Sequence, residues 1–218
     1  MASTPKPATV ELRSQLLDHA LALLEESGPE AISVRTLARL SARSTQAIYT
    51  TYPGMPALKT ELATRGHVEL ANHLAAHPVT KNPVLDLFVT VNAYLAWTRA
   101  HPRLYQFMTT IDLNAAPRTD DHTRISHRPA EATMRAATGR VIDAGVVHCP
   151  DPTYLYLQIA AALHGSALIE LELTTRGQPA ASGQTGLELI ANLIIALGSD
   201  KAATHSALRR AQRANEHQ

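Results

Sequence analysis

The chain has one cysteine, Cys149, and almost no net charge. Both observations exclude some classes of protein. A single cysteine cannot close an intramolecular disulfide or form a thiolate metal cage, so a reducing, cytoplasmic setting is expected. With 20 Lys and Arg against 19 Asp and Glu the net charge is +1, which excludes a polycation drawn to any nucleic acid or anionic membrane. Any basic function must therefore be local.

Neither a targeting segment nor a membrane segment is expected from the sequence. The opening MASTPKPATV fails the pattern of a secretory signal because no apolar run follows its lysine, and residues 1–8 are expected to form a flexible arm. The most apolar long segment, Tyr154–Leu173, is interrupted by polar and charged residues, so no membrane partner is expected. A helix that is apolar on most of its circumference is buried on two sides, which predicts a subunit interface there.

Runs of alternating β-branched residues are absent, whereas helix signals occur almost everywhere. We predict an all-α protein with about nine helices. Their expected ranges are 10–28, 34–40, 44–49, 56–76, 84–100, 102–110, 121–144, 153–175 and 185–197. The predicted organisation is a small helical domain at 9–54, a larger helical domain at 55–198 and a polar tail at 199–218.

Acidic residues are missing from the stretch STQAIYTTYPGMPALK, residues 44–59, which also contains two prolines. From Ala31 to Thr60 the charged residues are all basic, namely Arg35, Arg39, Arg43 and Lys59. Such a segment approaches phosphates without like-charge repulsion, and each contact releases a condensed counterion. The prolines act as punctuation: Pro53 ends one helix, Gly54 permits a turn and Pro56 suits the first turn of the next helix.

Two short helices joined by a tight turn describe a helix-turn-helix DNA reader. Ser33 and Ser44 are expected to cap the two helices. In the second helix Ile48 faces inward, while Thr45, Gln46, Tyr49 and Thr50 point outward. Gln46 can make a bidentate contact to adenine, and Thr45 can offer a hydroxyl to a base or a methyl to thymine.

Residues 29–63, PEAISVRTLARLSARSTQAIYTTYPGMPALKTELA, resemble the DNA-binding domain of TetR-family transcriptional regulators. NAYLAWTRAHPRLYQFM, residues 92–108, through IAAALHGSALIELEL, residues 159–173, resembles the C-terminal region of the subgroup marked by a Trp-x-x-x-His-Gly helix. The resemblance implies a ligand-responsive repressor that binds a pseudo-palindromic operator in double-stranded DNA as a homodimer. A largely apolar small molecule is the expected effector, with no cofactor and no catalytic activity.

The departures from the family pattern concern three places. Ala42-Arg43 stands where the family usually has Gly-Val, so that Arg43 is expected to lay its stem over the core and reach a phosphate. Met55 stands where the family usually has a phosphate-binding lysine, although the peptide N–H groups of that helix start remain available. Ala160 replaces the subgroup's tryptophan, while His164 and Gly165 are kept.

The candidate site residues fall into three sets. The predicted DNA-binding residues are Arg35, Arg43, Ser44, Thr45, Gln46, Tyr49, Thr50, Thr51, Met55 and Lys59, with Tyr49 assigned to phosphate by resemblance. The predicted ligand-binding residues are Tyr94, Trp97, Phe107, Met108, Met134 and His164, on helices that by resemblance surround a cavity. The predicted dimerisation residues are Leu168, Leu171, Leu189, Leu193 and Ile194.

Two other functions compete with DNA binding. A metal-dependent enzyme is suggested by His73 and His77, one helical turn apart with His67 upstream, and by the second group Asp120, Asp121, His122 and His127. No glutamate lies between the helical histidines in a zincin pattern, and no glycine-rich phosphate loop or nucleophile elbow is present. A helical homodimer without DNA binding is the other alternative.

Overall fold

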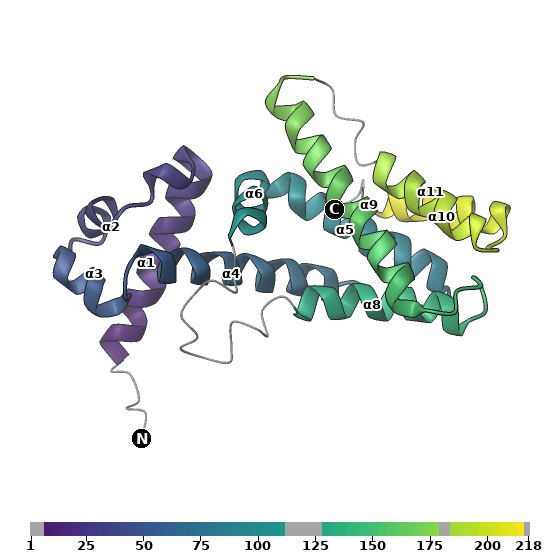
Figure 1. Ribbon diagram of the computed structural model, residues 1–218, viewed down its shortest axis with the longest axis horizontal. Helices are drawn as coiled ribbons and strands as arrows, with labels where there is room; N and C mark the ends of the chain where they lie inside the picture. The colour runs from purple at the N-terminus through teal and green to yellow at the C-terminus, as the bar shows by residue number, and fades with distance from the viewer. Residues whose placement is uncertain (1–6, 112–127, 179–183, 216–218) are drawn as a thin grey trace. The chain divides into compact units, whose positions relative to one another are not determined.

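The computed structural model of the chain describes residues 7–111, 128–178 and 184–215, and every regular element in these ranges is helical (Figure 1). The predicted all-α class is therefore confirmed. The α-helices are α1 (Pro7–Ser27), α2 (Val34–Leu40), α3 (Thr45–Thr51), α4 (Met55–Ala75), α5 (Pro83–Ala100), α6 (Pro102–Thr110), α8 (Arg128–Asp143), α9 (Pro152–Thr175), α10 (Gln184–Ala196) and α11 (Lys201–Asn215), with a short 3-10 turn, η1, at Pro29–Ala31.

The chain forms two compact units, and the first comprises residues 1–68 and 103–127. It contains α1, η1, α2, α3, the first part of α4 and α6. Its core is made of leucines from α1 and α4 together with Leu37 of α2 and Ile48 of α3, all fully or almost fully buried. This packing holds the two short helices against the long α1.

The second unit comprises residues 69–102 and 128–218. Helix α5 lies at its centre and packs against α8, α9, α10 and α11. Most α5 side chains are buried, so this helix is apolar nearly all round. Two polar contacts link it to its neighbours. Asn92 Nδ2 donates to the Ala211 carbonyl of α11 at 3.0 Å in a buried hydrogen bond, and Arg99 Nη1 lies 3.2 Å from Glu170 Oε1 of α9 in a partly buried ion pair.

The structure adds one helix to the prediction and shifts some boundaries. Residues 201–215, assigned to a polar tail, form α11, because Thr204, Ala207, Leu208 and Ala211 bury one stripe of an otherwise charged helix. Helix α1 begins at Pro7, inside the segment predicted to be an arm, and residues 1–6 lie outside the described residues. The predicted 121–144 helix is described from Arg128 onward.

No helix within the described ranges is both long and apolar enough to cross a membrane.

Candidate nucleic-acid interface and ligand pocket

Both short helices of the predicted DNA reader begin at a serine cap. The Ser33 hydroxyl accepts a hydrogen bond from the Thr36 amide at 3.2 Å, which starts α2. The Ser44 hydroxyl accepts one from the Ala47 amide at 3.2 Å, which starts α3. Each cap satisfies an amide that has no partner inside its helix, so the two predicted helix starts are confirmed.

The turn between α2 and α3 places Ala42 at φ 52°, in the left-handed region. A side chain at such a position crowds the backbone, which is why glycine is usual there. The turn is closed by the Arg43 amide, which donates to the Ala38 carbonyl at 2.9 Å, and by the Ser41 hydroxyl, which donates to the Leu37 carbonyl at 2.7 Å. This chain therefore keeps the tight turn despite lacking the glycine.

Helix α3 has an inward and an outward face. Ile48 is buried. Tyr49 is 55% exposed, and Thr45, Gln46 and Thr50 are exposed as well. Thr51, which the sequence analysis grouped with the DNA-binding residues, is only 8% exposed. Its hydroxyl donates to the Ala47 carbonyl at 2.9 Å, so Thr51 belongs to the packed side and does not share the outward face.

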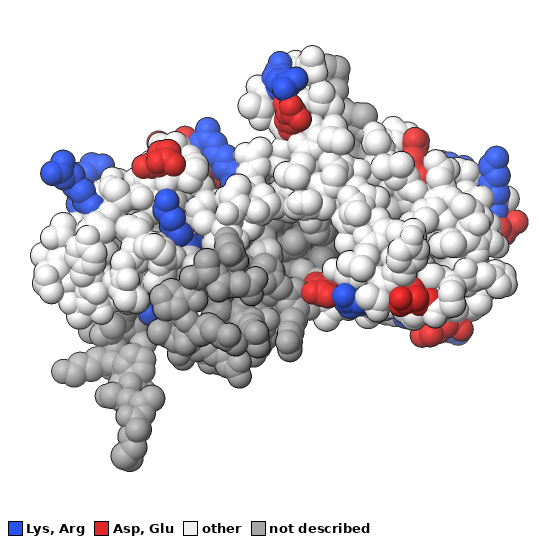
Figure 2. Space-filling model, viewed as in Figure 1, with Lys and Arg blue, Asp and Glu red and all other residues white. Residues whose placement is uncertain are grey.

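The basic side chains around this helix are exposed. Arg35 on α2 and Arg43 in the turn both reach solvent, as does Arg39. The surface over α2 and α3 carries Lys and Arg and no Asp or Glu in the face that Figure 2 shows. Met55 is the first residue of α4, and Lys59 follows one turn later, both half-buried. All predicted DNA-binding residues thus lie in the first unit, on α2, in the turn that follows it, on α3 and at the start of α4.

A buried tyrosine fixes the end of α3 to the long helices of its unit. Tyr52 caps the C-terminal end of α3, and its ring lies under the Arg13 guanidinium of α1 at 4.7 Å. Arg13 also pairs with Glu61 of α4, and Arg65 of α4 pairs with Asp18 of α1. Burial raises the pKa of Tyr52, and the Glu61 carboxylate raises it further, so the ring stays uncharged.

Helices α4 and α6 approach closely at Gly66. A Cβ atom on Gly66 would lie 2.5 Å from Met108 Sδ and 3.2 Å from Leu104 Cδ1, so any larger residue would require the Met108 side chain to move. Arg103 of α6 also donates from Nη1 to the Glu25 carbonyl at the end of α1, at 2.8 Å. Phe107 and Met108, two of the predicted ligand-binding residues, are buried on this helix. Sequence analysis did not identify Gly66; a lone small residue inside a long helix was its only signal.

The other predicted ligand-binding residues lie in the second unit. Trp97 and Met134 are buried, Tyr94 is half-buried and His164 is exposed on α9. The Trp97 ring stacks at a tilt on His101, with centroids 4.9 Å apart. None of the six predicted residues lines the pocket that the structure describes in this unit.

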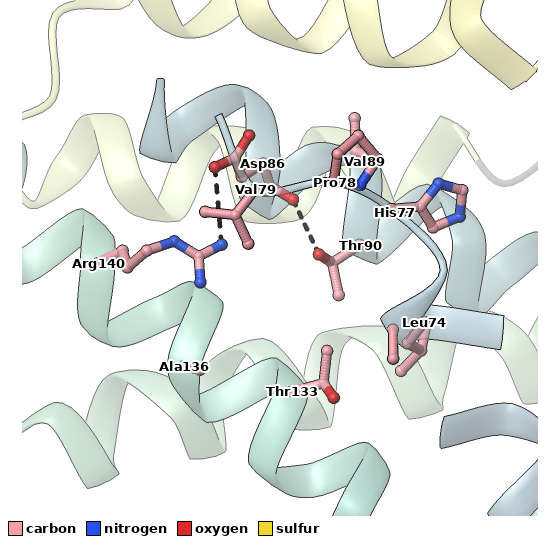
Figure 3. Close-up of a pocket in the computed structure, with 11 residues that line it drawn as sticks. Leu74, His77, Pro78, Val79, Asp86, Val89, Thr90, Thr133, Ala136 and Arg140 are labelled. Carbon is pink, nitrogen blue, oxygen red and sulfur yellow. Dashed lines mark hydrogen bonds and ion pairs between the residues drawn. The ribbon is translucent and has the colours of Figure 1, made fainter. Parts of the chain in front are cut away.

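That pocket has a volume of about 220 Å³ and lies between the end of α4, the segment 76–82, α5 and α8 (Figure 3). Its polar side is built by an ion pair across 3.7 Å between Arg140 Nη2 of α8 and Asp86 Oδ2 of α5. Its apolar lining includes Leu74, Val79 and Val89. Asp86 and Arg140 lie far apart in the sequence, and neither was predicted to have a role.

The predicted dimerisation residues divide between the interior and the surface. Leu171 is buried and Ile194 is 0% exposed, so both belong to the core of the second unit. Leu168 and Leu193 are half-buried, and Leu189 is 48% exposed. Large apolar side chains missed by the sequence analysis also reach the surface of α9, namely Tyr154, Leu157 and Ile169.

The histidines proposed for a metal site are arranged differently from a ligand set. The rings of His73 and His77 meet edge to face, with centroids 5.9 Å apart. No cluster of three or more His, Cys, Asp or Glu suited to a metal occurs in the part of the chain that the structure describes. Asp120, Asp121, His122 and His127 lie outside that part.

Residues 87–193 match the sequence model of a family described as "Tetracyclin repressor-like, C-terminal domain". No curated protein has a sequence that matches this chain.

Several solved structures share the fold. A protein of unknown function from Rhodococcus sp. RHA1 is 22% identical with a TM-score of 0.72, covering 86% of this chain and 96% of its own. A putative TetR-family regulator from Shewanella sp. PV-4 is 17% identical with a TM-score of 0.61, covering 84% and 97%. RolR in complex with resorcinol is 13% identical with a TM-score of 0.66, covering 93% and 95%. The C-terminal region of the chain therefore matches a tetracyclin repressor-like C-terminal domain, and the fold of the chain is that of solved TetR-family regulators.

Proposed function

We propose that the protein is a cytoplasmic, ligand-responsive repressor that binds a pseudo-palindromic operator as a homodimer. The observation that carries the proposal is the outward face of α3. Thr45, Gln46, Tyr49 and Thr50 are exposed together on a helix whose start, turn and end are all fixed by hydrogen bonds or packing. A reading helix needs this combination of exposed hydrogen-bonding groups and a rigid base.

The charges around α3 support contact with DNA phosphates. Arg35 and Arg43 are exposed, and no carboxylate occurs between Ala31 and Thr60. Arginine beside a polar helix gives the electrostatic attraction, while the amide of Gln46 gives base preference. Tyr49 is assigned to phosphate, because its phenol is exposed and no acidic side chain lies within its own helix.

The homodimer is supported by the surface of α9 and α10. Leu189 is exposed on α10, and Ile169 and Leu157 are exposed on α9. Large apolar groups on adjacent helices favour burial against another protein surface, and a second copy gives the two-fold symmetry that a palindrome requires. The interface is therefore proposed on Leu168, Leu189 and Leu193, with the buried Leu171 and Ile194 behind it.

Ligand response is supported by the pocket in the second unit and by the similarity in fold to RolR, whose structure contains resorcinol. Tyr94 and His164 stay as candidates for effector contact, since neither is buried. A ligand changes DNA affinity only if it binds one arrangement of the protein better than another.

Selection from randomised double-stranded DNA with the full-length chain tests this function. A pseudo-palindromic sequence should be enriched, and Gln46→Ala should lose that enrichment while Gln106→Ala, an exposed glutamine on α6, keeps it. Enrichment of a single asymmetric half-site would contradict dimeric reading. Recovery of no sequence would favour the alternative of a helical dimer that does not bind DNA.

A further inference from the structure

Two of the residues that line the pocket of the second unit carry a buried polar atom without a hydrogen-bond partner. Arg140 Nε and His77 Nε2 are both buried, and neither has a hydrogen-bond partner. Both residues line the same cavity of about 220 Å³. Figure 3 shows the Arg140 guanidinium and the His77 ring toward opposite sides of the pocket, with Thr90 and Thr133 between them. Buried polar groups are nearly always paired with protein, water or a ligand, so a molecule bound in this cavity could gain hydrogen bonds from these two groups.

The carboxylate of Asp86, in contrast, has partners for both of its oxygen atoms. Asp86 Oδ2 accepts the Thr80 amide at 2.9 Å, and Asp86 Oδ1 accepts the Thr80 hydroxyl at 2.7 Å. Arg140 Nη2 adds its charge from 3.7 Å, and the Asp86 side chain is 4% exposed. Asp86 therefore holds the segment before α5 in place and neutralises Arg140, but offers little to a ligand.

The charges of the lining cancel. Asp86 and Arg140 contribute one negative and one positive charge. Burial lowers the pKa of His77 from 6.5, and the neighbouring His73 lowers it further, so His77 is uncharged at neutral pH. A charged ligand would enter a cavity with no net counter-charge and would lose its hydration, which disfavours both anions and cations.

The remaining lining sets the size and polarity of the occupant. Leu74, Pro78, Val79, Val89 and Ala136 present apolar surface. A volume of about 220 Å³ is smaller than the usual range for drug-sized ligands, and it suits a molecule of about one ring. The unpaired Arg140 Nε–H is a donor and requires an acceptor atom on that molecule.

We propose that this pocket binds a small uncharged molecule with an apolar body and a hydroxyl or carbonyl oxygen, and that this oxygen accepts a hydrogen bond from Arg140 Nε. A second polar group on the molecule would pair with His77 Nε2. The inference deepens the ligand-responsive part of the proposed function and rests on that function only for the link to DNA. It assigns the binding site to residues that were not predicted from the sequence to bind an effector.

Three one-ring probes, phenol, benzoate and benzylamine, test whether the pocket prefers an uncharged ligand. Their binding to the full-length chain is measured by ligand-observed NMR titration. Phenol should bind at least about tenfold more tightly than either ion, because only phenol combines a ring with an uncharged oxygen. Equal binding of benzoate or benzylamine would overturn the proposal.

Two variants test the position of the binding site and the role of Arg140 Nε as the hydrogen-bond donor. Ala136→Phe fills the cavity and should weaken phenol binding about tenfold or more, whereas Ala132→Phe, one turn earlier on α8 and outside the lining, should leave it unchanged. Arg140→Lys keeps a cation beside Asp86 but removes Nε–H, and should weaken phenol binding several-fold without changing the helical content seen by circular dichroism. Phenol binding that survives both Ala136→Phe and Arg140→Lys would overturn the site.

A gel shift without any probe separates this proposal from the proposed function. Loss of phenol binding in Ala136→Phe with intact DNA binding supports the site. If the wild-type chain binds phenol as expected but never shifts DNA, the pocket stands and the regulator proposal fails. If it shifts DNA but phenol binds no better than the two ions, the regulator stands and the pocket proposal fails.

Discussion

Two exposed helix surfaces of this protein have opposite chemistry. The outward face of α3 presents hydroxyl, amide and phenol groups, with arginines nearby. The outward face of α9 and α10 presents Leu157, Ile169 and Leu189. Apolar surface gains about 25 cal/mol for each Å² removed from water, whereas polar groups gain little unless a partner restores their hydrogen bonds. Exposure alone therefore says little about function, and the chemistry of the exposed groups separates a DNA partner from a protein partner.

The sharpest way to test this comparison lies within α10 itself, which has a buried and an exposed side. Ile194→Ala should lower the free energy of unfolding by about 2–5 kcal/mol, because Ile194 is 0% exposed and truncation leaves a cavity. Asn192→Ala, on the exposed side, should change it by less than about 0.5 kcal/mol. Chemical denaturation at one protein concentration measures both. Similar losses in the two variants would mean that α10 is oriented differently.

The apolar face is tested by Leu189→Arg. The charge should weaken the dimer by about tenfold or more while the monomer stays folded, because Leu189 is 48% exposed in a single chain. Sedimentation velocity across a concentration series, with circular dichroism as a check on folding, measures the change. Val68→Arg, another exposed apolar position on α4, is the matched control. A Leu189→Arg protein that stays dimeric at micromolar concentration would place the interface elsewhere.

The polar face is tested by Gln46→Ala and Tyr49→Phe. Gln46→Ala should cost about 1–3 kcal/mol on the preferred operator and relax the preference at one position in each half-site. Tyr49→Phe should lower affinity evenly, because a phosphate contact carries no base preference. Binding measured against a panel of single-base operator variants distinguishes the two patterns. A uniform loss in Gln46→Ala would contradict its assignment as a base reader.

The turn that supports the polar face carries backbone strain at Ala42. Ala42→Gly should raise the free energy of unfolding by about 1 kcal/mol, because glycine adopts φ 52° without steric cost. Ala22→Gly, exposed in the middle of α1, should lower it by about 1 kcal/mol. Thermal or chemical unfolding of both variants shows whether the signs differ. Destabilisation by Ala42→Gly would mean that the left-handed turn is not adopted in solution.

The smallest expected effect concerns the start of α4. Met55→Lys should strengthen DNA binding and steepen the slope of log affinity against log salt by about two units per dimer, one for each phosphate gained. Base preference should stay the same. Lys59 lies one turn later, and if it already reaches the same phosphate, Met55→Lys combined with Lys59→Ala should restore the wild-type slope. An unchanged slope in every variant would remove the start of α4 from the DNA contacts.

Local signals made the two short helices α2 and α3 predictable from the sequence. The hydroxyls of Ser33 and Ser44 each accept a hydrogen bond from the amide three residues further along the chain, and these bonds start α2 and α3. Pro53 and Gly54 separate α3 from α4. Thr51 was grouped with the DNA-binding residues, although its spacing of three from Ile48 puts both on one side of the helix, where Thr51 is buried.

Signals for the second unit were weaker because its helices are apolar on several sides. Ile194 and Leu189 are both large and aliphatic, yet one is buried and the other is exposed. Helix α11 was missed because alanine and threonine form much of its buried stripe. The pocket was missed because Asp86 and Arg140 meet only when α5 packs against α8.

The sequence by itself determined where α2 and α3 begin, where a turn separates α3 from α4, and which short segment avoids negative charge. Caps, prolines, glycines and side-chain spacing act within one or two helical turns, so no distant residue is needed to establish them. Only the tertiary structure decided which apolar faces are covered, that the Met108 side chain packs against Gly66, and that Arg140 and His77 line the same cavity. Those outcomes depend on which distant helices pack together, because burial is a property of the neighbours that a side chain finds and not of the side chain alone.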